Sequence, residues 1–227
     1  MFKRNQEKNI QAEKEVLIRG KHPFLIQLHY SFQSPERIYF VVDYINGGDL
    51  FFHLRKLKKF SELDARFYAC EIILGLEFLH KKGFVYRDLK PENVLIDSEG
   101  HVKLTDFGLA KRMDFKNSEK TFSFCGTPNY LAPEIIDKTG YDFMVDWWAL
   151  GIILYELVAG MPPFFGTNQY QVIANIINYE YPRKDHFSKV FTSLLNGLLT
   201  KNPKKRLGMS ESGTESIDDV KNHQFFQ

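Results

Sequence analysis

Hydrophobic residues recur at helical spacing along much of the chain. This pattern predicts helices over residues 8–18, 49–58, 61–80, 146–159, 169–178, 189–200 and 217–222. Residues 146–159 are apolar almost all round, which is typical of a helix surrounded by protein. Ser61, with Asp64 three residues later, predicts a capped start for the 61–80 helix. Its expected inward stripe consists of Phe67, Ile72, Leu76 and Leu79.

Short strands are expected between these helices. The candidate strands are residues 24–32, 37–44, 84–86, 94–96 and 102–104. Turn residues at 34–36 and 97–100 would join neighbouring strands into hairpins. The run Asn46-Gly47-Gly48 interrupts the pattern, and the sequence beyond it becomes mainly helical. The sequence therefore predicts an α+β protein with a helical majority and a break near residue 45.

The overall composition narrows the class of protein. Of the 227 residues, 44% are hydrophobic and 26% charged, as in ordinary globular proteins. The net charge of +2 argues against nucleic-acid or membrane binding driven by bulk charge. The most apolar run, 147–155, is too short for a transmembrane segment, and no signal peptide is expected. Cys70 and Cys125 form no disulfide framework, so we expect a cytoplasmic protein.

The segment Tyr86-Arg87-Asp88-Leu89-Lys90-Pro91-Glu92-Asn93, followed by Asp106-Phe107-Gly108, carries the chemistry. Phosphoryl transfer needs a carboxylate near the incoming hydroxyl and oxygen ligands for Mg²⁺ on the phosphates. Asp88 can supply the carboxylate, and Asn93 with Asp106 the magnesium ligands. Lys90 can neutralise the transferring phosphate. The alternative is that all four are ordinary loop and turn residues.

Residues 13–226 resemble the AGC group of Ser/Thr protein kinases, the relatives of protein kinases A, B and C. The resemblance rests on D-x-x-x-x-N followed by D-F-G, on Ala132-Pro133-Glu134, on Tyr86 where most kinases have His, on Cys125-Gly126-Thr127-Pro128 and on Trp147-Trp148. Segments 45–52 and 103–109 are most similar to the branch that holds protein kinase B, the serum-regulated kinases and the ribosomal S6 kinases.

This resemblance implies a two-lobe kinase-like fold. Residues 1–44 would be a partial N-lobe of one helix and about two strands, and residues 45–227 the C-lobe with its catalytic and activation loops. The implied activity is transfer of the γ-phosphate of ATP, with Mg²⁺, to Ser or Thr of protein substrates. No glycine-rich loop or strand lysine precedes Glu13, so we expect an N-terminally truncated kinase with impaired activity.

The resemblance also assigns nucleotide-binding positions. Val42 would guard the adenine pocket, and the backbone of Asp43 and Ile45 would meet the adenine edge. Glu13 matches the helix glutamate that pairs with the strand lysine of kinases. The alternative for Glu13 is a solvated helix acid.

A regulatory phosphosite is implied at Ser123. Arg87 and Lys111 are the cations that would bind the phosphate, since phosphoserine pairs well with such groups. An upstream activating kinase would then be a partner. The alternative is that Ser123 is an unmodified loop hydroxyl.

Substrate-binding and structural positions follow by the same resemblance. Thr127 would line the acceptor site. The acids expected to bind arginines upstream of the phosphorylated residue are Asp49, Glu92 and Glu156, so basic protein substrates are implied. The alternative is three ordinary surface or structural acids. The residues with structural roles would be Glu134 and Arg206, as a buried ion pair, and Asp146.

Two other functions remain open from the sequence. A catalytically inactive binding or scaffold module would use the substrate groove, although it would not need Asp88, Asn93, Asp106 and Ser123. An unrelated metal-dependent hydrolase is the other possibility, and the sequence has no His or Cys cluster of the kind such enzymes use.

Overall fold

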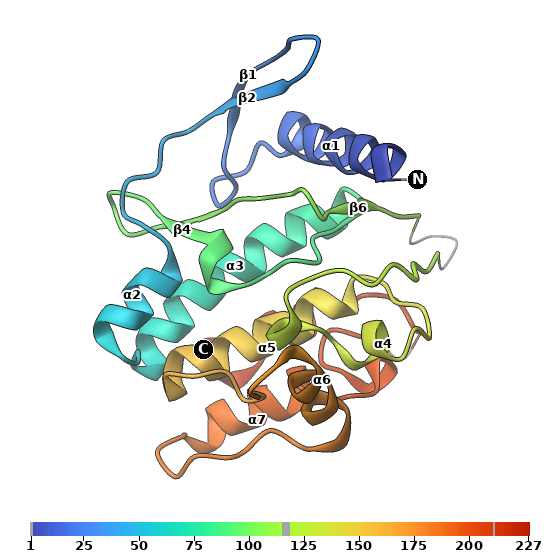
Figure 1. Cartoon of the computed structure of the whole chain (residues 1–227). Helices are drawn as coiled ribbons and strands as arrows, with labels where there is room; N and C mark the ends of the chain where they lie inside the picture. Colours follow the sequence, from blue (N-terminus) through green and yellow to red (C-terminus); the bar gives the residue numbers. More distant parts are fainter. Residues whose placement is uncertain (1, 115–118, 211) are drawn as a thin grey trace.

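The computed structural model describes residues 2–114, 119–210 and 212–227, with the backbone alone for residues 2–9. Its helices are α1 (Phe2–Arg19), α2 (Leu50–Leu57), α3 (Glu62–Lys81), α4 (Pro133–Ile136), α5 (Met144–Ala159), α6 (Gln169–Asn178), α7 (Lys189–Leu198) and α8 (Ile217–Lys221). Most of them gather in the lower part of Figure 1, whereas α1 lies near the top. The predicted α+β class is confirmed, and α1 begins six residues before the expected start. Over the described ranges, no helix has the length and apolar character that a membrane crossing requires.

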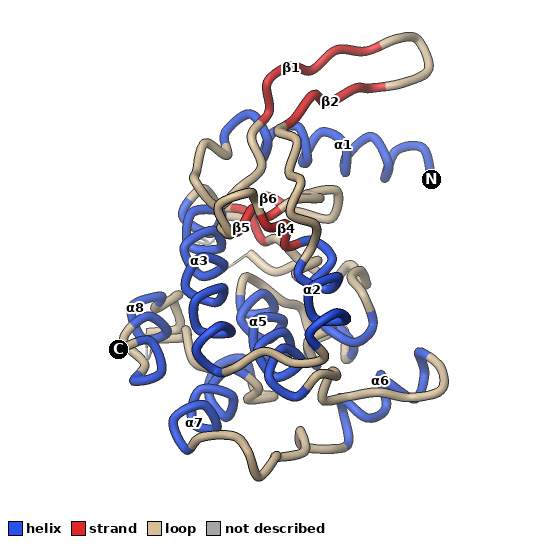
Figure 2. Tube along the Cα trace, turned by 90° about the vertical axis from the view of Figure 1, so that its left-hand side faces the viewer, coloured by secondary structure: helices blue, strands red, loops and turns tan. Residues whose placement is uncertain are grey.

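The strands form small antiparallel pairs in the described part of the chain. β1 (Leu28–Gln33) pairs with β2 (Ile38–Val42), and β4 (Val94–Ile96) pairs with β5 (Val102–Leu104). β3 (Phe84–Val85) pairs with β6 (Lys111–Arg112), a strand that the sequence did not predict because its two residues are both polar. Figure 2 shows the β1–β2 hairpin projecting beyond α1.

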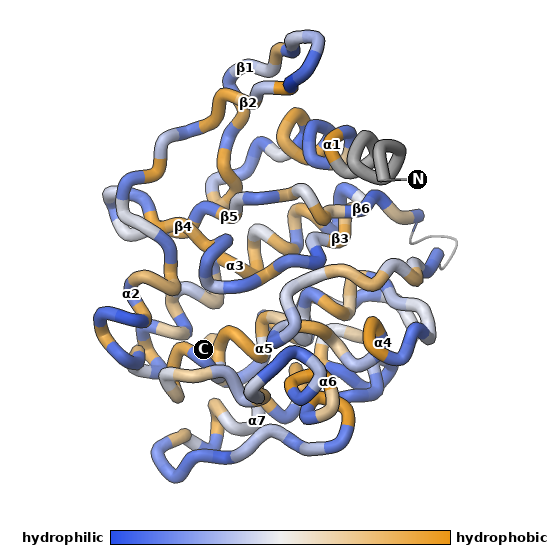
Figure 3. The backbone as a smooth tube through the Cα atoms, in the orientation of Figure 1, coloured by the Kyte–Doolittle hydropathy of each residue, from blue (hydrophilic) through white to orange (hydrophobic). Residues whose placement is uncertain are grey.

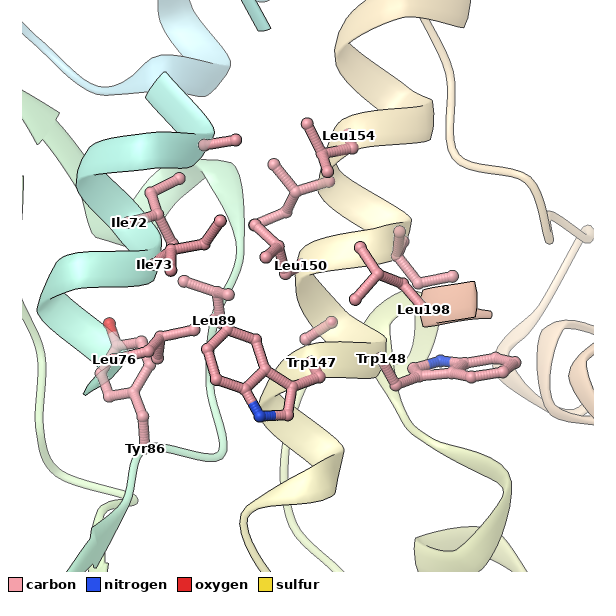
Figure 4. Close-up of a cluster of buried hydrophobic side chains, with 14 of the residues drawn as sticks. Ile72, Ile73, Leu76, Tyr86, Leu89, Trp147, Trp148, Leu150, Leu154 and Leu198 are labelled. Atoms are coloured by element: carbon pink, nitrogen blue, oxygen red, sulfur yellow. The ribbon is translucent and has the colours of Figure 1, made fainter. Parts of the chain in front are cut away.

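The main core lies between α3 and α5. Ile72 and Leu76 of α3 are fully buried beside Leu150 of α5, as Figure 4 shows, and Leu198 of α7 lies on the other side of α5. Much of α5 itself is accordingly drawn on the hydrophobic side of the scale in Figure 3. Phe67 was wrongly assigned to the inward stripe of α3. It is 45% exposed, because it lies on the outer side of the helix beside Tyr68 and His101.

Local sequence signals set the ends of these two helices. The Ser61 hydroxyl accepts a hydrogen bond from Asp64 N at 3.1 Å, and the Asp64 carboxylate accepts one from Ser61 N at 3.3 Å, which confirms the predicted cap. Gly160 ends α5 with φ of +84°, a conformation that favours glycine. The Ser61 cap thus defines the start of α3, and Gly160 defines the end of α5. The loops of the site are connected to these two helices.

The N-terminal segment joins the rest of the protein through backbone hydrogen bonds. Ile26 N donates to Leu104 O at 2.9 Å, and Leu104 N donates to Phe24 O at 2.8 Å. Val16 and Leu25 are buried in the same hydrophobic core as α3. The division into residues 1–44 and 45–227 as two lobes stays a prediction.

Candidate active site

Three other predicted site residues converge around the carboxylate of Asp88. Lys90 Nζ donates to Asp88 Oδ2 at 2.8 Å, and the Thr127 hydroxyl donates to Asp88 Oδ1 at 3.0 Å. Asn93 Nδ2 donates to Asp88 Oδ2 at 3.1 Å and to the Asp88 carbonyl at 2.9 Å. Lys90 Nζ also lies 3.1 Å from Thr127 Oγ1. The loop after β3 and the segment 127–130 therefore present one connected polar cluster.

Asp146, at the start of α5, holds the backbone that carries this cluster. Its buried carboxylate accepts hydrogen bonds from Tyr86 N at 2.9 Å and from Arg87 N at 2.8 Å. Arg87 has a φ of +69°, which costs an L-residue about 1–2 kcal/mol. The Asp146 carboxylate thus stabilises a strained turn directly before Asp88. This contact agrees with the structural role expected for Asp146.

Asp106 follows β5 and lies near the same cluster. Thr105 N donates to Asn93 O at 3.1 Å, so the loop of Asp106 runs beside Asn93. Asp106 has a φ of +55°, and its Oδ1 accepts from Gly108 N at 3.2 Å. Burial first, and then the charges of Asp88 and Asp106, raise the pKa of the Tyr86 phenol well above its usual value. The Tyr86 hydroxyl donates to the Thr105 carbonyl, which ties the two loops together.

The donor atoms at this site fit Mg²⁺. Asn93 uses its amide nitrogen to contact Asp88, which leaves its side-chain oxygen without a protein partner in the described ranges. Asp106 likewise has one carboxylate oxygen with no such partner. No group of three His, Cys, Asp or Glu among the described residues is arranged to hold a metal. Two hard oxygen donors suit an ion that keeps several waters and relies on substrate phosphates.

The residues expected at the adenine edge lie in the segment after β2. Asp43 N donates to Gln27 O at 3.1 Å, and its carboxylate accepts from His29 Nε2 at 2.7 Å and from Gln27 N at 3.0 Å. Within the described chain, no hydrogen bond is made by the Asp43 carbonyl or the Ile45 amide. Val42 and Ile45 pack against the core. The segment thus offers one free acceptor and one free donor beside apolar side chains.

Glu13, on α1, approaches the Asp106 loop. Burial first, and then the negative charge of Asp106, raise the pKa of Glu13 above its usual range. Over the described side chains, no ion pair involves Glu13. Glu13 therefore faces the Asp106 loop, and its role in nucleotide binding stays a prediction.

The loop that carries Ser123 contacts Arg87 directly. Arg87 Nη1 donates to Ser123 Oγ at 2.7 Å, and the Tyr141 hydroxyl donates to the Ser123 carbonyl at 2.7 Å. Lys111 lies in β6 opposite Val85, and no contact joins its side chain to Ser123 in the part of the protein described. The structure brings together one of the two predicted cations with the predicted phosphosite.

The three predicted substrate acids differ in their surroundings. Asp49 caps α2, because its Oδ1 accepts from Phe52 N at 2.7 Å. Glu92 is exposed. Glu156 is buried and accepts a hydrogen bond from the Tyr130 hydroxyl at 2.6 Å. Burial raises the pKa of Glu156 to about 7, the Tyr130 hydrogen bond opposes this shift and the charge of Glu92 adds to it. Sequence reasoning missed Tyr130, since no local signal marks its partner.

Two further groups complete the frame of the site. Arg206 and Glu134 form the expected buried ion pair, with contacts of 2.6 and 2.9 Å. His80 was missed by sequence reasoning, and its Nε2 lies 2.8 Å from Asp146 Oδ2. A histidine at the end of an apolar helix gives no sequence signal for such a contact.

Comparison with known proteins identifies the family. The protein kinase domain family matches residues 2–226. The serine/threonine-protein kinase Sgk1 of Danio rerio is 50% identical over all 227 residues, which cover 51% of that relative. Sgk1 of Gallus gallus is 50% identical and Sgk1 of Homo sapiens 48% identical, again over the whole chain and over 51% and 52% of the relatives. The chain spans about half the length of these curated relatives. The predicted resemblance to AGC-group Ser/Thr kinases is confirmed, and the chain belongs to the protein kinase domain family.

Proposed function

We propose that this chain is a protein serine/threonine kinase that transfers the γ-phosphate of ATP to Ser or Thr in arginine-containing protein substrates. The observation that carries the proposal is the cluster of Asp88, Lys90, Asn93 and Thr127, joined by hydrogen bonds of 2.8–3.1 Å. A positioned carboxylate, a cation and magnesium-binding oxygens are the parts that phosphoryl transfer requires.

Asp88 acts on the incoming substrate hydroxyl in this mechanism. As the hydroxyl oxygen bonds to the γ-phosphorus and the bond to ADP breaks, the hydroxyl proton passes to the Asp88 carboxylate. The Lys90 ammonium, 2.8 Å from Asp88 Oδ2, offsets negative charge on the transferring group. The Thr127 hydroxyl contacts both Asp88 and Lys90, so Thr127 would line the acceptor site.

Asn93 and Asp106 would hold Mg²⁺, which supplies charge neutralisation on the phosphates when it is bound. The Asp43 carbonyl and the Ile45 amide would bind the adenine edge, and Val42 would border the adenine ring. The absence of a cation beside Glu13 in the described chain leads us to expect lowered turnover by this chain. Loss of one charge-stabilising group commonly costs about 10²–10³ in rate.

The substrate preference follows from the acids beside the acceptor site. Glu92 would offer an exposed carboxylate to arginine, and Glu156 a buried one that also accepts from Tyr130. The Asp49 carboxylate also caps α2. Phosphorylation of Ser123 by an upstream kinase would add charge next to Arg87. The free Cys70 and Cys125 suit a reducing compartment, and we propose the cytoplasm.

A catalytically inactive binding or scaffold module is the second candidate. The observation in its favour is Glu13, whose carboxylate faces Asp106 without a cation beside it among the described residues. The two proposals differ in the role of Asp88, because a kinase needs its carboxylate to accept a proton and a binding or scaffold module does not.

The test is phosphate transfer to an arginine-rich peptide with Mg²⁺ and ATP. The variant Asp88→Asn should abolish transfer while the Mg²⁺-ATP thermal shift of the chain persists. The matched control Asp137→Asn, an exposed acid at the end of α4, should behave as the unsubstituted chain does. Unchanged transfer by Asp88→Asn would refute the role of Asp88. A chain that binds Mg²⁺-ATP but never transfers phosphate would favour the scaffold.

A further inference from the structure

His80, at the C-terminal end of α3, lies between two carboxylates. Its Nδ1 is 2.5 Å from Glu215 Oε1 and its Nε2 is 2.8 Å from Asp146 Oδ2. The side chain of His80 is fully buried. An ionised carboxylate only accepts hydrogen bonds, so each contact requires an N–H on the ring. A neutral imidazole has one N–H and would leave a lone pair facing one of the carboxylates.

We infer that Glu215 is a positioning residue for the catalytic loop, acting through a doubly protonated His80. The His80 imidazolium donates to Asp146, whose two oxygens accept from the backbone amides of residues 86 and 87. Glu215 supplies the second anion that keeps both ring nitrogens protonated and fixes the orientation of the ring. Through Glu215, the segment after residue 206 is thereby linked by hydrogen bonds to the turn directly before Asp88.

Glu215 is itself held in place. Trp147 Nε1 donates to the same Glu215 oxygen at 3.0 Å, and Glu215 forms a β-bridge with Met209. The Glu215 side chain is 15% exposed. A carboxylate fixed by the fold on one side and by an indole on the other can orient a buried imidazole without much loss of side-chain entropy.

The electrostatics of the site agree with this geometry. Burial lowers the pKa of His80, but the charges and hydrogen bonds of Glu215 and Asp146 overcome it and raise the pKa to about 10. Trp147 and Phe143, which do not titrate, also contact the ring. The charged residues Arg112, Asp114 and Glu119 line the same pocket as His80. Lys81, the next residue on α3, is exposed and pairs with Glu77. Stabilisation by the imidazolium is therefore complete below the unfolded value of 6.5 and is lost as pH rises through about 10.

The orientation that His80 gives to the Asp146 carboxylate matters most for the backbone of Arg87. Its φ of +69° is strained, and the Asp146 carboxylate is what its amide contacts. An Asp146 that loses its imidazolium partner is held less firmly, because the amides of residues 86 and 87 are then its remaining donors in the described chain. The importance of this turn for phosphate transfer rests on the kinase function proposed above, but the state of His80 does not.

The experiment uses the 227-residue chain with ¹⁵N-labelled histidine and backbone amides. Histidine nitrogen shifts are recorded from pH 6 to 11, and amide exchange is recorded at Tyr86, Arg87 and the buried Leu194 of α7. The variant Glu215→Gln keeps an acceptor for Trp147 and removes the charge. Asp219→Asn is the matched control, an exposed acid whose side chain makes no contact in the described ranges.

We expect both nitrogens of His80 to be protonated at pH 8 in the unsubstituted chain. Glu215→Gln should lower the pKa of His80 by about 1–3 units and speed amide exchange at Tyr86 and Arg87 by about tenfold, with Leu194 unchanged. Asp219→Asn should change neither. These readouts need no phosphate transfer, so a failed kinase assay would leave them intact.

Two results would overturn the inference. One is a neutral His80 imidazole at pH 8 in the unsubstituted chain, which decides the matter even where the variant folds poorly. The other is a Glu215→Gln protein in which both the His80 titration and the amide exchange of Tyr86 and Arg87 match the unsubstituted chain.

Discussion

The guanidinium of Arg206 and the carboxylate of Glu134 form a two-point ion pair that is almost completely shielded from solvent. Arg206 Nη1 and Nη2 lie 2.6 and 2.9 Å from the two carboxylate oxygens. The same guanidinium donates to the Met144 carbonyl at 2.8 Å and lies 5.2 Å from the ring of Trp148. Arg206 therefore joins α4, which carries Glu134, to the buried start of α5 at Met144.

Removing Arg206 should destabilise the fold strongly. In Arg206→Met the Glu134 carboxylate would stay buried without a partner, which typically costs about 3–5 kcal/mol of unfolding free energy. Urea denaturation followed by circular dichroism measures the change. Lys205→Met, at an exposed neighbouring position, should change stability by less than about 0.5 kcal/mol. A loss below about 1 kcal/mol in Arg206→Met would contradict the buried pair.

Arginine-peptide binding should depend on pH through Glu156. Burial raises the pKa of this carboxyl to about 7, against the Tyr130 hydrogen bond and with the help of the Glu92 charge. Arginine binds the ionised form, so affinity should fall by about tenfold from pH 8 to pH 6. Fluorescence anisotropy with a labelled peptide measures this.

Substitution separates Glu156 from other acids. Glu156→Gln should bind the peptide weakly and with no pH dependence over this range. Glu99→Gln, in an exposed turn, should keep the wild-type profile. The same profile in Glu156→Gln would show that another group titrates.

Glu13 should cost stability at neutral pH. Burial and the charge of Asp106 raise its folded pKa above 4.5, so the folded chain binds more protons than the unfolded chain. Stability therefore falls as pH rises from 4.5 to the folded pKa and stays lowered above it. Glu13→Gln should raise the melting temperature at pH 7.5. The gain in unfolding free energy should be less than about 1 kcal/mol, because the carboxyl is half-buried and screened.

Two comparisons check the sign for Glu13. The gain in Glu13→Gln should disappear near pH 4, where the wild-type carboxyl is protonated in both states. Glu36→Gln, at the exposed tip of the β1–β2 hairpin, should have no such effect. A lowered melting temperature in Glu13→Gln at pH 7.5 would mean that the carboxylate has a favourable partner.

Local signals in the sequence predicted most of the helices and strands, whereas the roles of the site residues stay predictions. The cap at Ser61, the hairpin of β4 and β5 and the contacts of Asp88 with Lys90 and Asn93 all depend on residues close together in the chain. The spacing of Asp88 and Asn93 was enough to predict that their side chains lie together, because the short turn between them allows few backbone conformations. Thr127 was placed by the family resemblance instead.

Two contacts between distant segments escaped sequence reasoning, whereas the Glu134–Arg206 pair was expected from the family resemblance alone. Tyr130 and Glu156 are 26 residues apart, and His80 and Glu215 are 135 residues apart. Their pairing depends on how α3, α5 and the loops pack, which no local pattern encodes. Phe67 was misplaced for a related reason, since a helical stripe is wide and only the packed neighbours decide its edges.

Negative charge at Ser123 should order the loop that carries it. Ser123 Oγ lies 2.7 Å from Arg87 Nη1, so a phosphate or a carboxylate there would gain a charge-assisted hydrogen bond. Ser123→Glu should raise the unfolding free energy by about 0.5–1 kcal/mol, because the contact is solvent-exposed. It should also slow tryptic cleavage after Lys120. Ser98→Glu adds the same charge in an exposed turn and should do neither. Equal cleavage rates in the two variants would mean that Arg87 binds the hydroxyl but not an anion.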